Sequence, residues 1–537
     1  MALCFSNNIS EIQKEVRQIM RKIFVLLVLW AWFPVNGQEL PRSEPSKERV
    51  SSLAIIQFLD TLEQSEHEMH SLMVVKNGKV IAEGWWDPYQ SDIKQTMYSV
   101  SKSFTATAIG FAVKEKLLSV DDRVLSFFPD HSPEDEASYL YDLRVRDLLT
   151  MSVGHEKDMT FDVIAQDDWP SQFLKIPIIK PPGTHFVYNT IATYMLSAIL
   201  QQITGETLLQ YLQPRLFEPL SIVNVDWETD PMGVNVGGYG LRLKTEDMAK
   251  FGQLMLQRGQ WHGQQLLPIR WIVDASSVHI FQEPTAPIEK REVSDWHQGY
   301  GYQMWRSRHQ SFRADGAFGQ YILVLPELGS VVAITSETDN MQALLNLVWE
   351  FLLPGLDVEE PTPEKDASLR QRLEGLYISP FVGIANTSLE EELQKKRFEF
   401  TANDWGMNTL KLYFNDDQLK LVLTDDNQES FPLEFGKGTW LQSETLRKGP
   451  NLAGNAKDAM EGLAPFLVAG SYGWKDDSTL VAKLNYLESP HTETIEIVFE
   501  DKDNISLCIY SMVKGKDKSM PVKGSRLSDM AQVLSIP

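Results

Sequence analysis

The chain has 537 residues, and its 73 acidic against 50 basic side chains give a formal net charge of −23 at pH 7. This acidic balance argues against a nucleic-acid-binding protein, because such proteins present a basic surface to phosphate groups. The length predicts about two or three domains, and the hydrophobic residues, 43% of the chain, are sufficient for large cores.

Residues 1–37 are predicted to be an N-terminal extension followed by a signal peptide. Met20 opens a short basic stretch, and residues 23–33 are apolar but too few to span a bilayer comfortably. Small residues before Gln38 offer a cleavage point, so we take Met20 as the true start and expect a periplasmic or secreted protein. After cleavage no stable membrane span is expected; a retained membrane anchor is the alternative.

Residues 38–356 combine strand and helix patterns. Asn77-Gly78 between two apolar runs predicts a β-hairpin at residues 72–82, and helical patterns dominate residues 99–270. Strand patterns then return at residues 301–305, 317–325 and 330–335. Because strands stand at both ends of this region, we expect an α/β (α+β) fold: one antiparallel sheet flanked by helices, with a helical subdomain.

The last third of the chain has a different pattern. Residues 357–368 are acidic, contain prolines and lack periodicity, so they are predicted to be a linker. Residues 409–423 alternate between apolar and polar side chains, turn at 415–417 and alternate again. This repetition predicts an all-β barrel or sandwich domain over residues 369–537.

The pattern Ser-x-x-Lys places a serine and a lysine on one helix face, where a desolvated lysine can take the serine proton. It occurs three times, at Ser91, Ser99 and Ser511. Only Ser99 begins a strong helical pattern, so Ser99 and Lys102 are the candidate pair. The alternative is that Ser99 only caps a helix and that Lys102 is solvated.

Four stretches together resemble the serine β-lactamase and penicillin-binding-protein superfamily, in its class C β-lactamase-like branch. They are residues 98–111, 182–190, 238–253 and 313–320. The resemblance covers about residues 50–355 and implies a β-lactamase/transpeptidase-like fold for the region 38–356.

The resemblance also implies catalytic roles. Ser99 corresponds to the acylating nucleophile, Lys102 to its base, and Tyr188 to a second base or proton shuttle that returns the proton to the leaving group. The chemistry needs such a group, because a tetrahedral adduct collapses only when its leaving group is protonated.

The same resemblance implies an oxyanion site in the last of these stretches, residues 313–320, which corresponds to the third motif of the superfamily. The backbone N–H of Ser99 would be one donor, and an N–H at or next to Phe318 would be the other. Gly316 and Gly319 are expected to let the backbone approach a substrate closely.

Two motifs depart from the usual pattern. Asn189 stands one place early in the second motif, and Thr190 fills the usual asparagine position, where it is expected to bond Lys102 or a substrate carbonyl. Asp315-Gly316-Ala317 occupies the third motif, so a carboxylate replaces a cation beside the site. β-Lactams carry a carboxylate that such a cation receives, so we expect an enzyme that is not an efficient β-lactamase.

The sequence predicts neither a metal nor another cofactor, because it lacks a phosphate-binding glycine loop and a zinc-ligand pattern. We expect an exported serine hydrolase that cleaves an ester or amide in a small-molecule or short peptide-like substrate. The alternative is a silent penicillin-binding-like protein that binds a cell-wall fragment or a partner through its β-domain. The oligomeric state is not predicted.

Overall fold

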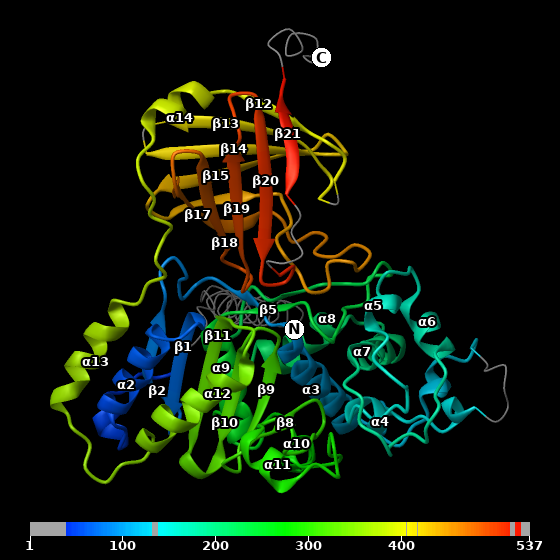
Figure 1. Cartoon of the computed structure of the whole chain (residues 1–537). Helices are drawn as coiled ribbons and strands as arrows, with labels where there is room; N and C mark the ends of the chain where they lie inside the picture. The colour runs from blue at the N-terminus through cyan, green and yellow to red at the C-terminus, as the bar shows by residue number, and fades with distance from the viewer. Residues whose placement is uncertain (1–38, 132–137, 404, 416, 516–520, 528–537) are drawn as a thin grey trace, which may run out of the picture.

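A computed structural model of the chain describes residues 39–131, 138–403, 405–415, 417–515 and 521–527. The predicted extension, its signal peptide and the start at Met20 lie outside these residues. Among the helices described, none is both long and apolar enough to cross a membrane. Figure 1 shows a part built of helices around a central sheet, with a β-barrel set against it.

The central sheet is antiparallel and has six strands in the order β2-β1-β11-β10-β9-β8. Asn77 and Gly78 both adopt left-handed backbone conformations and form the expected hairpin turn between β1 and β2. β1 also pairs with β11, about 260 residues further along the chain, as expected for a sheet built from distant strands. The strands are β1 (Glu68–Lys76), β2 (Lys79–Trp85), β8 (Trp305–Arg306), β9 (Phe312–Gly316), β10 (Gln320–Leu325) and β11 (Ser330–Glu337).

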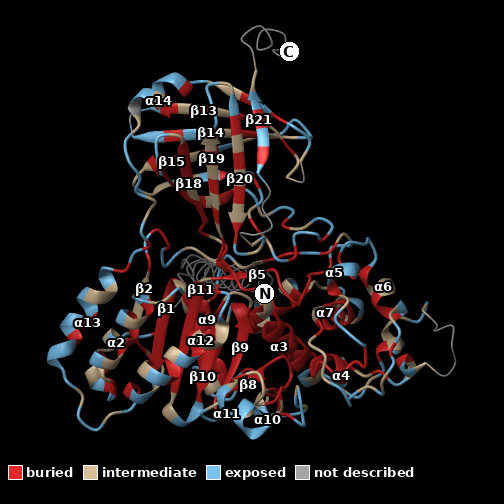
Figure 2. Ribbon diagram, in the orientation of Figure 1, coloured by how far each residue is buried: buried red, intermediate tan, exposed pale blue. Residues whose placement is uncertain are grey.

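Helices cover both faces of this sheet, and alternate residues of β1 enter two separate cores. Leu72 and Val74 pack with α2 (Ser52–Glu63) and α12 (Met341–Leu347). The helix α13 (Glu364–Glu374) lies against α2 and β2. Met73 and Val75 belong to the core that holds α3 (Ser101–Lys114) and α9 (Thr245–Leu256). Figure 2 shows α3 and the sheet within the buried interior. Small Ala, Ser and Thr side chains suit α3 to this place.

A helical region extends from α3 on the side away from α2 (Figure 1). Its helices are α4 (Val145–Leu149), α5 (Thr160–Val163), α6 (Trp169–Lys175), α7 (Thr190–Thr204) and α8 (Leu208–Leu212). Two further helices, α10 (Ile269–Ser276) and α11 (Ile288–Val293), precede β8. The small strands between the helices are β3 (Gln95–Thr96), β4 (Asp226–Trp227), β5 (Leu241–Leu243), β6 (Gln260–Trp261) and β7 (Gln264–Gln265).

The C-terminal part is a β-barrel, one of the two architectures predicted. Nine strands form a ring that is closed by a parallel pairing of β15 with β17, and β16 adds to β17. Its helix α14 (Thr387–Leu393) precedes the strands β12 (Arg397–Phe400), β13 (Met407–Asn415), β14 (Gln418–Asp425), β15 (Ser430–Lys437), β16 (Leu441–Thr445), β17 (Phe466–Trp474), β18 (Thr479–Tyr486), β19 (Thr492–Phe499), β20 (Asn504–Ser511) and β21 (Val522–Arg526).

Two connections of the barrel, residues 446–465 and residues 487–491, make contacts with the rest of the molecule. In the second, the Glu488 carbonyl accepts from the Thr96 N–H at 2.9 Å, and its carboxylate lies 3.3 Å from Arg242. In the first, the Met460 N–H donates to Glu228 at 3.1 Å. These bonds place the barrel directly beside the chain that leads to Ser99.

Candidate functional site

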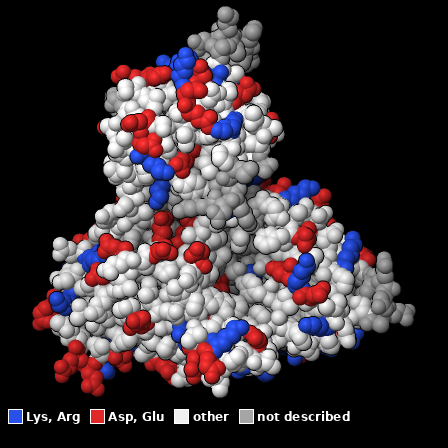
Figure 3. Space-filling model, in the orientation of Figure 1, with Lys and Arg blue, Asp and Glu red and all other residues white. Residues whose placement is uncertain are grey.

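Three charged side chains are buried close to Ser99. Charged side chains are spread over the face of the molecule seen in Figure 3, whereas burying an ion costs free energy unless it is paired or bonded. Lys102, Arg313 and Asp315 are only 1%, 0% and 6% exposed. Asp315 is bonded to Arg313, and its charge also acts on Lys102. This cluster marks the candidate active site.

Ser99 and Lys102 face each other at the start of α3. Ser99 belongs to a short 3-10 helix, Tyr98–Val100, that continues directly into α3. The Lys102 Nζ lies 2.8 Å from the Ser99 Oγ and 2.7 Å from the carbonyl oxygen of Gly238. Ser99 is half-buried, whereas Lys102 is enclosed. The serine is therefore the member of the pair that a substrate can reach.

Burial lowers the pKa of Lys102 to about 7, although the negative charges of Asp158 and Asp315 act to raise it. Burial has this effect because it disfavours the charged ammonium form. Near neutral pH a large fraction of Lys102 is therefore an uncharged amine, which can accept the proton of Ser99.

Tyr188 completes this group. Its side chain interacts with that of Ser99, and the Lys102 Nζ lies 4.9 Å from its ring centroid. The ring stacks on Trp305 with centroids 5.5 Å apart, which fixes its orientation. Burial, reinforced by the charge of Asp315, raises the pKa of Tyr188. The phenol therefore stays protonated at neutral pH, so it can donate a proton but is not available as a base before the reaction begins.

Asn189 and Thr190 have different surroundings. Asn189 is buried and caps α7: its Oδ1 accepts from the Ala192 N–H at 3.4 Å, and its Nδ2 donates to the His155 Nδ1 at 2.9 Å. Burial lowers the pKa of His155 to about 4, so the ring is neutral and can accept. Thr190 begins α7 next to Gly238, where a Cβ would lie 2.7 Å from its methyl group. The amide of Asn189 is thus used within the fold.

Asp315 is not an isolated negative charge, which corrects the electrostatic expectation from the sequence. Its carboxylate lies 3.0 Å from the Nε and 2.9 Å from the Nη2 of Arg313. The guanidinium lies under the ring of Trp296, 4.5 Å from its centroid, and also donates to the carbonyl of Asp295. The two buried charges therefore largely balance each other. Arg313 and Asp315 are two residues apart on β9, so their shared face was readable in the sequence.

Residues 317–319 form the turn between β9 and β10. Phe318 and Gly319 adopt left-handed backbone conformations, with φ of 65° and 90°. The Gly319 N–H donates to the Gly316 carbonyl at 3.2 Å, and the Ala317 carbonyl accepts from the Gln320 side chain at the same distance. The N–H of Phe318 remains the expected second oxyanion donor.

Gly316 and Gly319 are both required by close packing against protein. A Cβ at Gly316 would lie 2.2 Å from the carbonyl oxygen of Met97, two residues before Ser99. A Cβ at Gly319 would lie 2.3 Å from the Oγ of Ser336. The sequence led us to expect an approach to substrate, but these glycines bring the turn against the nucleophile segment and β11.

Sequence reasoning missed Asp158, Gly238 and Arg313 as neighbours of the catalytic group. The Gly238 carbonyl bonds Lys102 and the charge of Asp158 acts on it, and no local pattern in the sequence indicates either interaction. The residues that the structure describes contain no group of three or more His, Cys, Asp and Glu side chains arranged to hold a metal ion.

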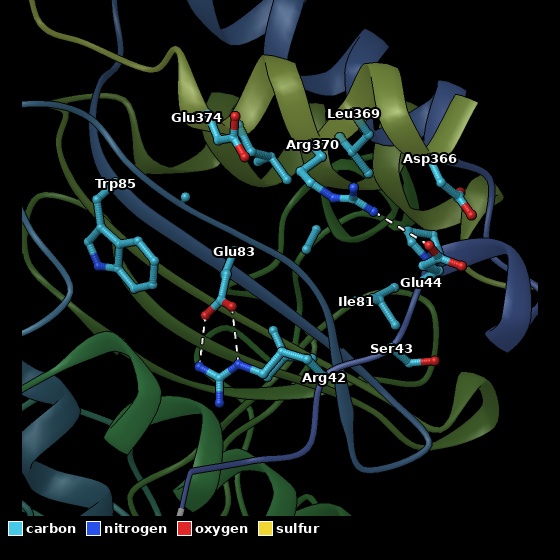
Figure 4. A pocket seen from close by; sticks show the side chains of 15 residues that line it. Arg42, Ser43, Glu44, Ile81, Glu83, Trp85, Asp366, Leu369, Arg370 and Glu374 are labelled. Carbon is cyan, nitrogen blue, oxygen red and sulfur yellow. Dashed lines mark hydrogen bonds and ion pairs between the residues drawn. The ribbon is translucent and has the colours of Figure 1, made fainter. Parts of the chain in front are cut away.

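A separate hollow of about 500 Å³ lies between β2 and α13, and its lining includes none of the site residues (Figure 4). Both of its arginines have acidic partners: Arg42 bonds Glu83 at 2.9 Å, and Arg370 bonds Glu44 at 3.4 Å. It therefore presents little unpaired charge to a ligand.

Comparison with known families gives a match over most of the helix-and-sheet part. The Beta-lactamase family model matches residues 61–351, more than half of the chain. A putative D-alanyl-D-alanine carboxypeptidase of Escherichia coli (strain K12) is 22% identical over 181 residues, 29% of this chain and 42% of that protein. An uncharacterized protein of Alkalihalophilus pseudofirmus is 22% identical over 226 residues, 37% of this chain and 61% of that protein. The chain thus matches less than two thirds of either relative.

Among solved structures, a putative 6-aminohexanoate-dimer hydrolase from Bacillus anthracis matches with a TM-score of 0.47 and 19% identity. That match covers 59% of this chain and 87% of the other. The octameric penicillin-binding protein homologue from Pyrococcus abyssi matches with a TM-score of 0.45 and 16% identity, covering 88% of this chain and 99% of the other.

Proposed function

Because the chain belongs to the beta-lactamase family of serine hydrolases, we propose that it cleaves an ester or amide through an acyl-enzyme on Ser99. The observation that carries this proposal is the 2.8 Å contact between the half-buried Ser99 hydroxyl and the buried Lys102 amine. The interaction of Tyr188 with the Ser99 side chain supports it, because it brings a second proton-carrying group to the nucleophile.

In the first step the neutral Lys102 amine accepts the hydroxyl proton of Ser99 and becomes an ammonium. The Ser99 Oγ forms a bond to the substrate carbonyl carbon, and the carbonyl electron pair moves to its oxygen. We expect the backbone N–H groups of Ser99 and Phe318 to donate hydrogen bonds to this oxyanion. Donors aimed in advance at developing charge account for a large share of catalysis in such sites.

In the second step the bond between the carbonyl carbon and the leaving group breaks. The leaving alkoxide or amine takes the proton of Tyr188, and the Lys102 ammonium replaces it. A water molecule then attacks the ester on Ser99 after giving a proton to the Lys102 amine. The carbon–Oγ bond breaks, Ser99 regains its proton, and a carboxylic acid is released.

We propose that the substrate is neutral or carries an amine, and that β-lactams are turned over poorly. A β-lactam carries a carboxylate that needs a cation in the site. The candidate cation, Arg313, is fully buried and bonded to Asp315. It therefore cannot reach a substrate carboxylate, and its charge is balanced by that of Asp315. Asp315 does not itself repel such a carboxylate strongly, because its pair with Arg313 is close to neutral.

A fluorophosphonate probe followed by mass spectrometry tests the acyl-enzyme. We expect one adduct on Ser99, and none in Ser99→Ala. Ser91→Ala is the matched control, because Ser91 belongs to another Ser-x-x-Lys sequence and is exposed. Absence of an adduct on Ser99 at every pH would refute the proposal and favour a binding protein without catalysis.

A substrate panel of p-nitrophenyl esters, D-amino-acid amides and nitrocefin, each run with Ser99→Ala, tests the substrate class. Turnover of an ester or amide that is lost in Ser99→Ala is expected. Rapid hydrolysis of nitrocefin would refute the argument from Arg313 while leaving the acyl-enzyme intact.

A further inference from the structure

The residue directly before the nucleophile has an unfavourable backbone conformation. Tyr98 has a φ of 45°, in the left-handed region that a large side chain rarely enters, and it is 4% exposed. Such a conformation persists only where surrounding contacts hold it, and these residues gather at functional sites. The contacts of Tyr98 therefore matter for the geometry of Ser99.

Both hydrogen-bond partners of the Tyr98 hydroxyl belong to connections of the barrel. The Tyr98 hydroxyl lies 2.5 Å from the Nε2 of His491, which is 393 residues further along the chain in the β18–β19 connection. The same hydroxyl accepts from the N–H of Leu452, in the β16–β17 connection, at 3.4 Å. The rings of Tyr98 and His491 both contact Phe318, with centroids 5.6 and 4.7 Å away. The barrel thus meets the nucleophile segment and the third-motif turn together.

His491 is itself held in place. It is fully buried, and its Nδ1 lies 2.7 Å from the Oε1 of Glu337, the last residue of β11. The Thr492 N–H donates to the other carboxyl oxygen of Glu337 at 3.2 Å. Burial lowers the pKa of His491 to about 3, so the ring is neutral. Burial also raises the pKa of Glu337 to about 8, so one proton is shared between Glu337 and the His491 Nδ1. The His491 Nε2 and the Tyr98 hydroxyl are joined by a second hydrogen bond.

We propose that His491 is a positioning residue for Ser99, acting through Tyr98. By holding the Tyr98 hydroxyl, it keeps the backbone in the left-handed conformation that turns the Ser99 N–H and Oγ toward the reacting carbonyl. The barrel is then part of the frame of the active site rather than a separate binding module. This inference rests on the acyl-enzyme at Ser99 proposed above.

The test measures how fast a fluorophosphonate labels Ser99 as probe concentration increases, which separates probe binding from the maximal labelling rate. Tyr98→Phe and His491→Ala should each lower the maximal rate about tenfold, the change expected from one lost hydrogen bond at a critical position. Probe binding should change little. His491→Gln, whose amide can replace the Nε2, should restore the rate to within about twofold of the unaltered protein.

The double variant Tyr98→Phe with His491→Ala should be no slower than the slower single variant, because both remove the same bond. Asn455→Ala is the matched control: Asn455 is exposed and bonds the Phe161 carbonyl at 2.9 Å across the same junction. It should label at the unaltered rate. Thermal melting of each variant shows that it is folded at the assay temperature.

Normal labelling of Ser99 in a folded His491→Ala variant would overturn the inference but leave the proposed function standing. So would equal slowing in Asn455→Ala, failure of His491→Gln to restore the rate, or a loss explained entirely by unfolding. If the unaltered protein does not label at Ser99, the proposed function fails and the inference fails with it.

Discussion

The burial of Lys102 predicts how acylation of Ser99 depends on pH. Only the neutral amine can take the Ser99 proton, so the rate should follow the deprotonated fraction of Lys102. With a pKa of about 7, that fraction is roughly one tenth at pH 6, about half at pH 7 and roughly nine tenths at pH 8. The labelling rate should therefore rise about tenfold from pH 6 to pH 8 and then level off.

Intact-mass spectrometry of fluorophosphonate labelling between pH 5.5 and 9 measures this profile, with circular dichroism to show that the protein stays folded. Asp158→Asn tests the predicted direction of the shift in the pKa of Lys102. The negative charge of Asp158 raises the pKa of Lys102, so its removal should move the midpoint to lower pH. Lys102→Arg should lower the rate by about 10² to 10⁴, because a guanidinium stays protonated.

Two outcomes would refute this reasoning. A rate that is constant from pH 6 to pH 8 would mean that Lys102 is not the base in the rate-limiting step. A rate that still rises tenfold per pH unit above pH 8 would mean that the lysine keeps an ordinary pKa near about 10.4 and is not desolvated.

Two further predictions concern stability. Gly316→Ala should lower the free energy of unfolding by about 1–3 kcal/mol, because its methyl group would meet the Met97 carbonyl. Gly375→Ala, where the nearest atom is 3.5 Å away, should change it little; equal thermal melting of the two variants would contradict the packing argument. Arg313→Met should cost about 3–5 kcal/mol at neutral pH, because it leaves Asp315 buried without its cation. Adding Asp315→Asn should recover part of that loss in urea unfolding, and no recovery would show that the charge is not the cause.

The sequence predicts the elements whose signals are local. The turn at Asn77-Gly78 needs two left-handed residues, and both residues adopt that conformation. The alternating strands of the C-terminal part predict a barrel or sandwich, and pairing of β15 with β17 closes a barrel. The contact between Ser99 and Lys102 follows from their spacing at the start of a helix.

Other features depend on contacts with distant residues. Residues 301–305 carry a strand pattern, but Tyr302 bonds the Ala275 carbonyl at the end of α10, and only Trp305–Arg306 forms a strand. The helix α13 begins inside the predicted linker 357–368, because Leu369 is buried and Arg372 bonds acidic side chains of α2. The contact of His491 with Tyr98 spans 393 residues, which no local pattern reveals.

The three Ser-x-x-Lys sequences show why spacing alone does not make a catalytic pair. Lys94 forms an ion pair with Asp226, so its amine is used there. Lys514 lies over the ring of Trp405, 3.7 Å from its centroid, so its amine is also used elsewhere. Only the amine of Lys102 is both enclosed and directed at its serine. The Ser-x-x-Lys spacing brings the two side chains together, but it is burial that lowers the pKa of Lys102 and leaves the amine uncharged near neutral pH.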